Sequence, residues 1–294
     1  MMYKLTSILI AAATLSAQRE DPAFALPSGV ELIPNIVYTS GGAPDKQLDL
    51  FLPKEGSGPF PAVVYVHGGG WNAGSKTAFR RQAADMATKG FVGVCINYRL
   101  SQEAKYPAAL HDSKAAVRWM RANAKKYRIN PDVIGAAGGS AGGHLVALLG
   151  TTGDLPAFEG DRGSAGFSSR VQAVAAFNPV IDFVIIGKRT SNDATNAITR
   201  FLGAPYAANP QLWADASPIT HVSKDSAPFL LLHGDADRLV PFQQSVEMRD
   251  KLKAAGVDAE LFTGKGGAHG FFNKPPYFDP ALAAMEAFFA RNLR

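Results

Sequence analysis

Residues 138–142 of the 294-residue chain read Gly-Gly-Ser-Ala-Gly, which matches the G-x-S-x-G pattern of a nucleophile elbow. In such an elbow, a tight turn between a strand and a helix presents a serine hydroxyl above the sheet, and the glycines leave room for the turn. An apolar run at 133–137 indicates a strand just before the pattern, and 144–149 indicates a helix just after it. We therefore predict that Ser140 is a nucleophile.

A serine hydroxyl needs a neighbouring base, and the base needs an acid that orients it. Asp237 and His269 each come directly after a predicted strand, so both can meet Ser140 at one edge of a sheet. The chain order Ser140, Asp237, His269 is the Ser…Asp…His order of α/β-hydrolase triads. Asp235 is an alternative to Asp237 as the acid. Four of the other histidines are expected to be structural: His111, His144, His221 and His233.

Residues 67–71 read His-Gly-Gly-Gly-Trp and follow a predicted strand at 62–66. Acyl transfer through a tetrahedral intermediate needs N–H donors where the oxyanion forms, and glycines let the backbone approach the substrate closely. We predict that the N–H groups of Gly68, Gly69 and Ala141 form the oxyanion hole. A flexible loop or a phosphate-binding turn is the alternative, although no P-loop Lys-Ser/Thr pair follows.

Short apolar runs alternate with segments of helical spacing along most of the chain. The predicted helices lie at 75–89, 107–127, 144–149, 242–255 and 280–292. The predicted strands lie at 35–39, 47–52, 62–66, 91–97, 133–137, 171–177, 229–232 and 259–263. Near-continuous apolar strands alternating with helices indicate an α/β fold, with a mostly parallel eight-stranded sheet covered by helices on both faces.

Two stretches interrupt this alternation, at 152–170 and 181–216. We predict that both follow strands at the carboxyl side of the sheet, where such folds bind ligands, and form short lid-like insertions over a pocket. Trp71 and Asp182 are the predicted substrate-binding residues, and for Asp182 the alternative is that it caps a turn.

Composition excludes several classes of protein. Hydrophobic residues make up 47% of the chain and charged residues 19%, which is enough for one substantial core and too little charge for a disordered or coiled-coil protein. The net charge of +5 is spread along the chain without a basic block, so we expect no nucleic-acid partner. Cys95 is the single cysteine and lies in an apolar run, which excludes an internal disulfide or a cysteine-based zinc site. No spacing indicates a metal site.

Residues 1–25 have the features of a secretory signal peptide. Lys4 provides a positive start and precedes a mostly apolar run that ends at Ala17, and residues 23–25 (Ala-Phe-Ala) form a cleavage site. Cleavage after Ala17 and a precursor that stays anchored are alternatives. The run is too short to span a bilayer, so we expect no stable membrane insertion after cleavage. We predict a secreted or periplasmic protein with one catalytic domain at 26–294.

Several segments together resemble the secreted bacterial bifunctional feruloyl and acetyl xylan esterases, and more broadly the hormone-sensitive-lipase-like carboxylesterases of the α/β-hydrolase superfamily. The resemblance covers about residues 30–293. It is carried by His-Gly-Gly-Gly-Trp at 67–71, Asn-Tyr-Arg-Leu at 97–100, Tyr-Pro-Ala at 106–108, Gly-Ser-Ala-Gly-Gly-His-Leu at 139–145, Ser-Arg-Val-Gln-Ala-Val at 169–174, Asp-Phe at 182–183, Ser-Pro-Ile-Thr at 217–220, and the segments around Asp237 and His269.

The resemblance implies an α/β-hydrolase fold in which Ser140 is the nucleophile, His269 the general base and Asp237 the acid. The chain departs from the family pattern at 177–180 (Phe-Asn-Pro-Val), where a Gly-Pro-Thr-like turn is commoner. It also departs at His221, where tyrosine is more usual, and over 184–200. These differences lie near the expected acyl pocket, so they affect the substrate more than the chemistry.

We expect a serine carboxylic-ester hydrolase that works through an acyl-enzyme and needs no cofactor or metal. The resemblance and the export signal imply acetyl or feruloyl (hydroxycinnamoyl) esters on plant polysaccharide as substrates. A general short-chain carboxylesterase is the first alternative. A prolyl-oligopeptidase-like peptidase is disfavoured because no propeller domain precedes residue 60. A non-catalytic binding module is also disfavoured, because such proteins usually lose a triad member.

Overall fold

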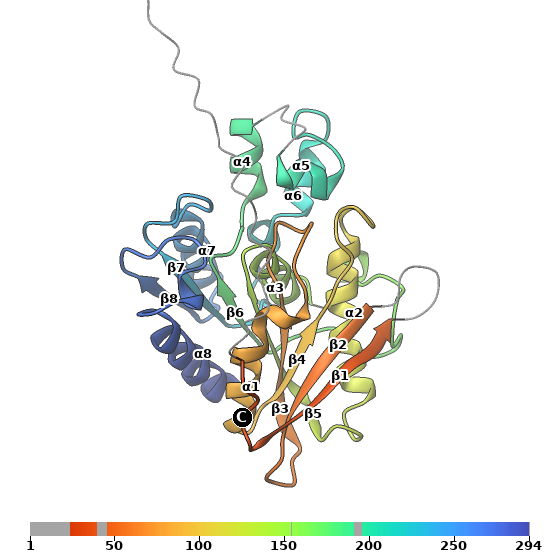
Figure 1. Ribbon diagram of the computed structural model, residues 1–294. Helices are drawn as coiled ribbons and strands as arrows, with labels where there is room; N and C mark the ends of the chain where they lie inside the picture. The colour runs from red at the N-terminus through yellow and green to blue at the C-terminus, as the bar shows by residue number, and fades with distance from the viewer. Residues whose placement is uncertain (1–23, 40–45, 154, 191–195, 294) are drawn as a thin grey trace, which may run out of the picture.

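Eight strands form a single sheet in the computed structural model (Figure 1). They are β1 (Val30–Thr39), β2 (Lys46–Pro53), β3 (Phe60–Val66), β4 (Val92–Ile96), β5 (Ile129–Gly139), β6 (Ala173–Phe177), β7 (Phe229–Gly234) and β8 (Ala259–Gly264). Their order across the sheet is β1-β2-β4-β3-β5-β6-β7-β8. The pairings of β2 with β1 and with β4 are antiparallel, and the others are parallel. The predicted mostly parallel eight-stranded sheet is confirmed.

The structure describes residues 24–39, 46–153, 155–190 and 196–293. Nearly all of the predicted signal peptide lies outside these residues, so the signal peptide stays a prediction.

The burial of each strand explains its sequence. Every residue of β4 and β6 is buried, as expected for parallel strands covered on both faces, and both strands read as continuous apolar runs. In β8, at the edge of the sheet, partly exposed residues stand between buried ends. Strand position therefore sets how apolar each run must be.

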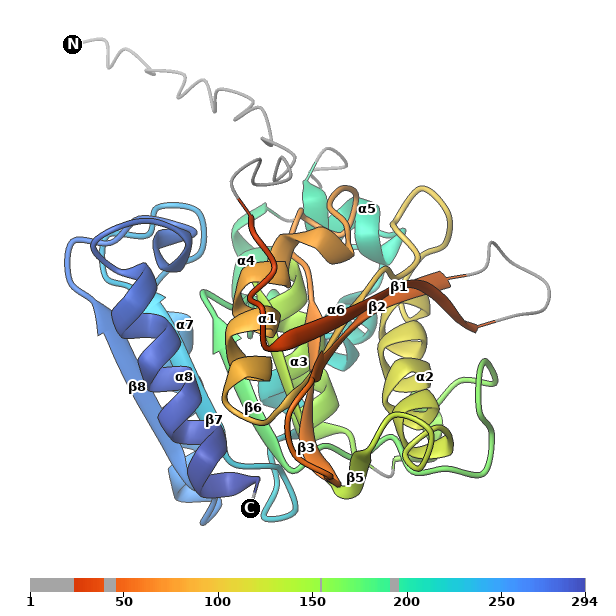
Figure 2. The same ribbon diagram turned by 60° about the horizontal axis from the view of Figure 1, so that its bottom comes forward.

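Helices cover both faces of the sheet. On one face lie α1 (Arg80–Thr88) and α8 (Phe278–Asn292), which Figure 2 shows crossing the near side, and their buried side chains share one core cluster with the strands. The second core cluster joins the sheet to α2 (Ala108–Ala122), α3 (Ala141–Thr151) and α7 (Gln243–Ala254). Among the described residues, no helix is long and apolar enough to cross a membrane.

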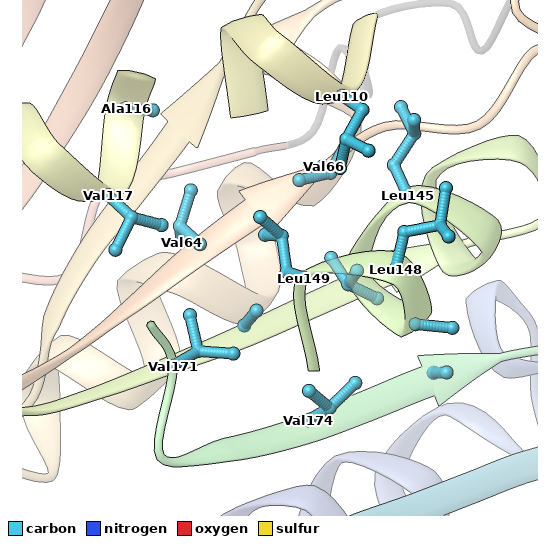
Figure 3. Close-up of a cluster of buried hydrophobic side chains, with 14 of the residues drawn as sticks. Val64, Val66, Leu110, Ala116, Val117, Leu145, Leu148, Leu149, Val171 and Val174 are labelled. Carbon is cyan, nitrogen blue, oxygen red and sulfur yellow. The ribbon is translucent and has the colours of Figure 1, made fainter. Parts of the chain in front are cut away.

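Helix α3 runs through the interior directly after Ser140. All 11 of its residues are buried, and Figure 3 shows Leu145, Leu148 and Leu149 packed between the sheet and α2. A helix that is apolar all round is typical of such a buried position. It begins at Ala141, whereas the sequence predicts a start at residue 144. Two glycines lower the helix propensity of this first turn, yet a Cβ at Gly142 would overlap the carbonyl oxygen of Val66. Close packing of α3 against β3 therefore requires a residue that obscures the helix start in the sequence.

The segment at 181–216 contains three short helices, α4 (Phe183–Thr190), α5 (Ala197–Leu202) and α6 (Pro210–Asp215). It follows β6, and Figure 1 shows the three helices above the carboxyl end of the sheet. Each helix has eight residues or fewer, which is too short to give the periodic pattern by which a helix is recognised in a sequence.

The prediction that 152–170 also follows a strand at the carboxyl side is wrong. This segment follows α3 and precedes β6, so it connects to the amino end of that strand. It is tied to α2 by ion pairs: Lys114 and Arg118 both contact Glu159, at 2.7 and 2.9 Å. Lys114 is wholly buried and also donates to the carbonyl oxygen of Thr152 (2.7 Å). The polar residues of this stretch satisfy buried charges on a helix.

Candidate active site

Ser140 occupies a strained turn between β5 and α3. Its backbone has φ 55° and ψ −117°, a left-handed conformation that residues with a side chain rarely adopt. The turn is tight, because a Cβ at Gly138 would lie 2.6 Å from the carbonyl oxygen of Gly142. The first N–H groups of α3 have no partner within the helix and place a partial positive charge beside the serine. The geometry is that of the predicted elbow.

The structure brings Ser140, His269 and Asp237 into one hydrogen-bonded chain. The Ser140 hydroxyl lies 2.9 Å from Nε2 of His269, and Nδ1 of His269 lies 2.7 Å from Oδ2 of Asp237. A carboxylate only accepts hydrogen bonds, so the imidazole proton sits on Nδ1 and leaves Nε2 free to accept the serine proton. The imidazole therefore has the tautomer that a general base requires.

Asp237 is held by several donors in addition to His269. Its Oδ1 accepts the backbone N–H groups of Leu239 and Val240 at 2.8 and 2.9 Å. Burial alone would raise the pKa of Asp237, but the hydrogen bonds from His233 and His269 and the backbone bond bring it well below its usual value. The carboxylate consequently stays ionised in neutral and mildly acidic solution.

His233, which was expected from the sequence to be only structural, contacts the carboxylate of Asp237. Its side chain is fully buried, and its Nε2 lies 3.3 Å from Oδ2 of Asp237 and 3.1 Å from the carbonyl oxygen of Val240. Both neighbours are acceptors, so Nε2 carries a proton, and Nδ1 forms a hydrogen bond with the hydroxyl of Ser245 (2.7 Å). The four-residue spacing between His233, near the end of β7, and Asp237, in the loop that follows, was the available signal.

Asp235, the alternative acid, is directed to other partners. It pairs with Lys265 (3.0 Å) and accepts the backbone N–H of Gly266 (2.6 Å). The structure therefore places Asp237, and not Asp235, against the imidazole of His269.

Asn178 also contacts His269, although the sequence analysis gave it no role. Its Nδ2 lies 3.3 Å from Nε2 of His269, and its Oδ1 accepts the backbone N–H of Gly270 at the same distance. Asn178 is buried and has φ 36°, a left-handed conformation in which asparagine is enriched. It belongs to the 177–180 turn that departs from the family pattern, and it links the end of β6 to the loop that carries His269.

The glycine-rich loop after β3 is pressed against the elbow. A Cβ at Gly68 would lie 2.8 Å from the carbonyl oxygen of Gly139 and 3.4 Å from Cβ of Ser140. Burial lowers the pKa of His67 to about 4, so its imidazole is neutral, and its Nδ1 contacts the carbonyl oxygen of Gly68 (2.7 Å). The C=O and N–H of a trans peptide point in opposite directions, so this bond turns the N–H of Gly69 away from His67. The three predicted oxyanion donors, Gly68, Gly69 and Ala141, thus belong to two segments that meet at Ser140.

We expect Gly69→Ala to reduce kcat for p-nitrophenyl acetate by about 10²- to 10³-fold, the effect of losing one oxyanion donor. Gly69 has φ 115°, and a Cβ there would overlap the carbonyl oxygen of Ala73, so the loop must shift and its N–H with it. Gly90→Ala is the matched control, because Gly90 has φ 86° with open space around its Cβ and lies between α1 and β4. Steady-state kinetics on both variants checks this expectation, and an equal loss in the two would attribute the effect to backbone strain.

Trp71 and Asp182, the predicted substrate-binding residues, have structural contacts. Trp71 is only 3% exposed and packs within aromatic side chains. The Asp182 carboxylate caps the start of α4 by accepting the backbone N–H of Ile185 (3.1 Å), and Gln244 bonds its backbone on both sides. The turn-capping alternative therefore describes the contacts of Asp182.

The described part of the chain contains no group of three or more His, Cys, Asp or Glu side chains placed to hold a metal ion. The arrangement at Ser140 can perform nucleophilic acyl transfer with its own side chains and backbone.

The chain is similar to several known proteins. The BD-FAE family model matches residues 48–252. The protein called probable carboxylic ester hydrolase LipM, from Mycobacterium tuberculosis, is 37% identical over 202 residues, which cover 67% of this chain and 46% of LipM. An acetylxylan esterase of Xylanibacter ruminicola is 30% identical over 228 residues, which cover 76% of this chain and 43% of that enzyme.

A solved structure has the same architecture. The truncated form of a carbohydrate esterase from gut microbiota superimposes with a TM-score of 0.81 at 32% identity, covering 89% of this chain and 96% of that one. In contrast, the chain spans about half the length of the curated relatives it matches, 46% to 58% for three of them. The similarity to the carbohydrate esterase, unlike that to the curated relatives, extends over both chains.

Proposed function

The chain belongs to the BD-FAE family, and from this premise we propose that it is a serine carboxylic-ester hydrolase with Ser140 as nucleophile. The observation that carries the proposal is the chain of hydrogen bonds from Ser140 through His269 to Asp237, at 2.9 and 2.7 Å. The names of the relatives, which include a carboxylic ester hydrolase and an acetylxylan esterase, support the same chemistry.

In the acylation step, Oγ of Ser140 attacks the ester carbonyl carbon while its proton passes to Nε2 of His269. Asp237 holds the Nδ1–H and stabilises the imidazolium that forms. The negative oxygen of the tetrahedral intermediate is stabilised by the oxyanion donors, each contributing about 3 kcal/mol. When the intermediate collapses, the proton on Nε2 is transferred to the leaving alcohol and the acyl group remains on Ser140.

Deacylation repeats the sequence with water as the nucleophile. His269, neutral again, removes a proton from water as the water attacks the acyl carbon, and then returns the proton to Oγ of Ser140. The side chain of His269 is 23% exposed, so water can reach the imidazole. The buried carboxylate of Asp237 holds the Nδ1 proton of the His269 imidazole through both half-reactions.

For the substrate, we propose acetyl or hydroxycinnamoyl esters carried by plant polysaccharide. Support comes from the resemblance stated above, the acetylxylan esterase relative and the carbohydrate esterase with the same fold. A general short-chain carboxylesterase is a second candidate, favoured by the name of the LipM relative.

An ester panel tests both proposals. We expect release of acetate from acetylated xylan or of ferulate from methyl ferulate, in addition to hydrolysis of p-nitrophenyl acetate, with Ser140→Ala as the blank. Products are measured by an acetate assay and by chromatography of ferulate. Activity on p-nitrophenyl esters alone would favour the general carboxylesterase. Failure to hydrolyse any ester would contradict the proposal that the protein is a carboxylic-ester hydrolase. Cleavage of peptide p-nitroanilides alone would indicate a peptidase.

A further inference from the structure

Three parts of the chain meet at the buried side chain of Trp71, which belongs to the glycine-rich loop. Its indole ring stacks on Phe201 of α5, with centroids 4.7 Å apart and planes 15° from parallel. The ring is edge-on to Phe183 of α4 (5.5 Å) and to His144 of α3 (5.3 Å). Trp71 thus contacts two helices of the 181–216 insertion and the helix that begins at the nucleophile.

Two hydrogen bonds of His144, together called the relay below, connect Trp71 to the end of the insertion. The indole N–H of Trp71 donates to Nδ1 of His144 (3.2 Å). Because the indole nitrogen is only a donor, Nδ1 is unprotonated, and the proton on Nε2 is donated to the carbonyl oxygen of Ala216 (2.7 Å). Ala216 directly follows α6. The imidazole of His144 therefore joins the glycine-rich loop to the end of the insertion.

His144 has the properties of a fixed connection. It is fully buried and stacks on Phe183 at 4.5 Å. Burial lowers the pKa of His144 to about 3, so it stays neutral and its two nitrogens keep their separate roles. A neutral imidazole with one donor and one acceptor, each satisfied, needs no compensating charge in the interior.

The backbone of the glycine-rich loop has a strained conformation that side-chain contacts must hold in place. Gly69, Gly70 and Trp71 have consecutive positive φ values of 115°, 58° and 59°. Glycine adopts these conformations freely, but tryptophan does not, so the contacts of its side chain must hold the backbone there. The carbonyl oxygen of Trp71 is also held by the backbone N–H of Ser101 (2.7 Å). The strained residue comes two positions after Gly69, which is expected to supply an oxyanion donor.

We propose that Trp71 and His144 are positioning residues that hold the glycine-rich loop against α3, the helix that follows the nucleophile. Through these two residues, the α4–α6 insertion acts on the oxyanion hole. The inference rests on the proposed function. Neither side chain needs to contact the substrate, which agrees with the 3% exposure of Trp71 and the complete burial of His144.

The test compares Trp71→Phe with Trp213→Phe. The first keeps an aromatic ring beside Phe201 but leaves Nδ1 of His144 without its donor. The second is the matched control, because Trp213 is also buried in the insertion and donates its indole N–H to the carbonyl oxygen of Ala204 (3.0 Å), away from the loop. Both variants lose one buried indole hydrogen bond, but only Trp71→Phe disconnects the loop.

Two readouts report on the oxyanion hole. The first is kcat and KM for p-nitrophenyl acetate. The second is inhibition by a trifluoromethyl ketone, whose carbonyl carbon bonds to Oγ of Ser140 while the serine proton moves to His269 and the ketone oxygen becomes an oxyanion. We expect Trp71→Phe to lower kcat and ketone affinity together, about 10- to 100-fold, with KM nearly unchanged, since the lost interaction acts on the transition state. Trp213→Phe should change neither, at a similar loss of Tm.

A second pair keeps the proposal testable if Trp71→Phe does not fold. His144→Phe removes both hydrogen bonds of the relay, whereas His144→Gln retains one acceptor and one donor. We expect His144→Phe to reduce kcat and ketone affinity and His144→Gln to restore most of both. The proposal is overturned if folded Trp71→Phe and folded His144→Phe have the kcat and ketone affinity of the wild type. It is also overturned if Trp213→Phe loses as much kcat and ketone affinity as Trp71→Phe. Failure of the proposed function itself would appear in the wild type, which would neither hydrolyse the ester nor bind the ketone.

Discussion

Ser140→Ala is expected to lower kcat for p-nitrophenyl acetate by about 10⁶-fold, the loss that follows removal of the nucleophile in enzymes of this mechanism. The hydroxyl that lies 2.9 Å from Nε2 of His269 is the atom that would bond to the acyl carbon. Alanine retains the Cβ, so the φ of 55° at this turn is no more strained than in the wild type. Circular dichroism should therefore show an unchanged fold.

A fluorophosphonate probe provides a measurement independent of turnover. The probe phosphorus bonds to the serine oxygen and fluoride leaves, so the wild type should be labelled and Ser140→Ala should remain unlabelled. Ser113→Ala is the control, because Ser113 is buried and its hydroxyl donates to the carbonyl oxygen of Ala109 (2.8 Å) on α2. This control should keep both activity and labelling. Labelling or turnover that survives in Ser140→Ala would refute the assignment of the nucleophile.

Asp237→Asn is expected to lower kcat by about 10⁴-fold through the wrong imidazole tautomer. An amide nitrogen facing Nδ1 of His269 favours an unprotonated Nδ1, which places the proton on Nε2, where it blocks transfer from Ser140. The wild-type carboxylate avoids this because it accepts from Nδ1 at 2.7 Å and stays ionised. Stopped-flow or steady-state hydrolysis of p-nitrophenyl acetate provides the measurement.

Asp235→Asn is the matched control for that substitution. It makes the same chemical change two positions earlier, at a carboxylate paired with Lys265 and not with the imidazole. Its kcat should stay close to that of the wild type. If Asp235→Asn lost activity and Asp237→Asn kept it, the assignment of the acid would be reversed.

The strands and the elbow could be predicted because their signals are local. Buried parallel strands such as β4 and β6 are short and continuously apolar, and the elbow requires glycines at fixed offsets from Ser140. The fold class and the meeting of Ser140, Asp237 and His269 at one edge of the sheet both follow from those signals.

Contacts that depend on how neighbouring loops approach one another could not be predicted. Asn178 follows β6 and His269 follows β8, two strands that are not adjacent in the sheet, and no pattern in the chain relates the two residues. The predicted position of 152–170 was also wrong, because the composition of this segment resembles that of a binding loop. Its Glu159 is instead required by the cations of α2, a relation that appears only after folding.

The helices of the insertion left weaker local signals that could have been used. Asn196 and Asn209 each accept a backbone N–H at the start of α5 and α6, and Pro210 occupies the first position of α6. Asparagine caps and an N-terminal proline are recognised helix starts. A search for caps would therefore have found two of the helices that periodicity missed.

The separate attachment of each triad residue to its own strand end has an evolutionary consequence. Because the α4–α6 insertion enters between β6 and β7, mutations accumulating in it can change the surface above the carboxyl end of the sheet while Ser140, Asp237 and His269 stay in place. Phe183 and Phe201 are the exceptions, since they are in contact with Trp71. Selection for new esters would thus have freedom over most of the insertion and little at these two aromatic positions.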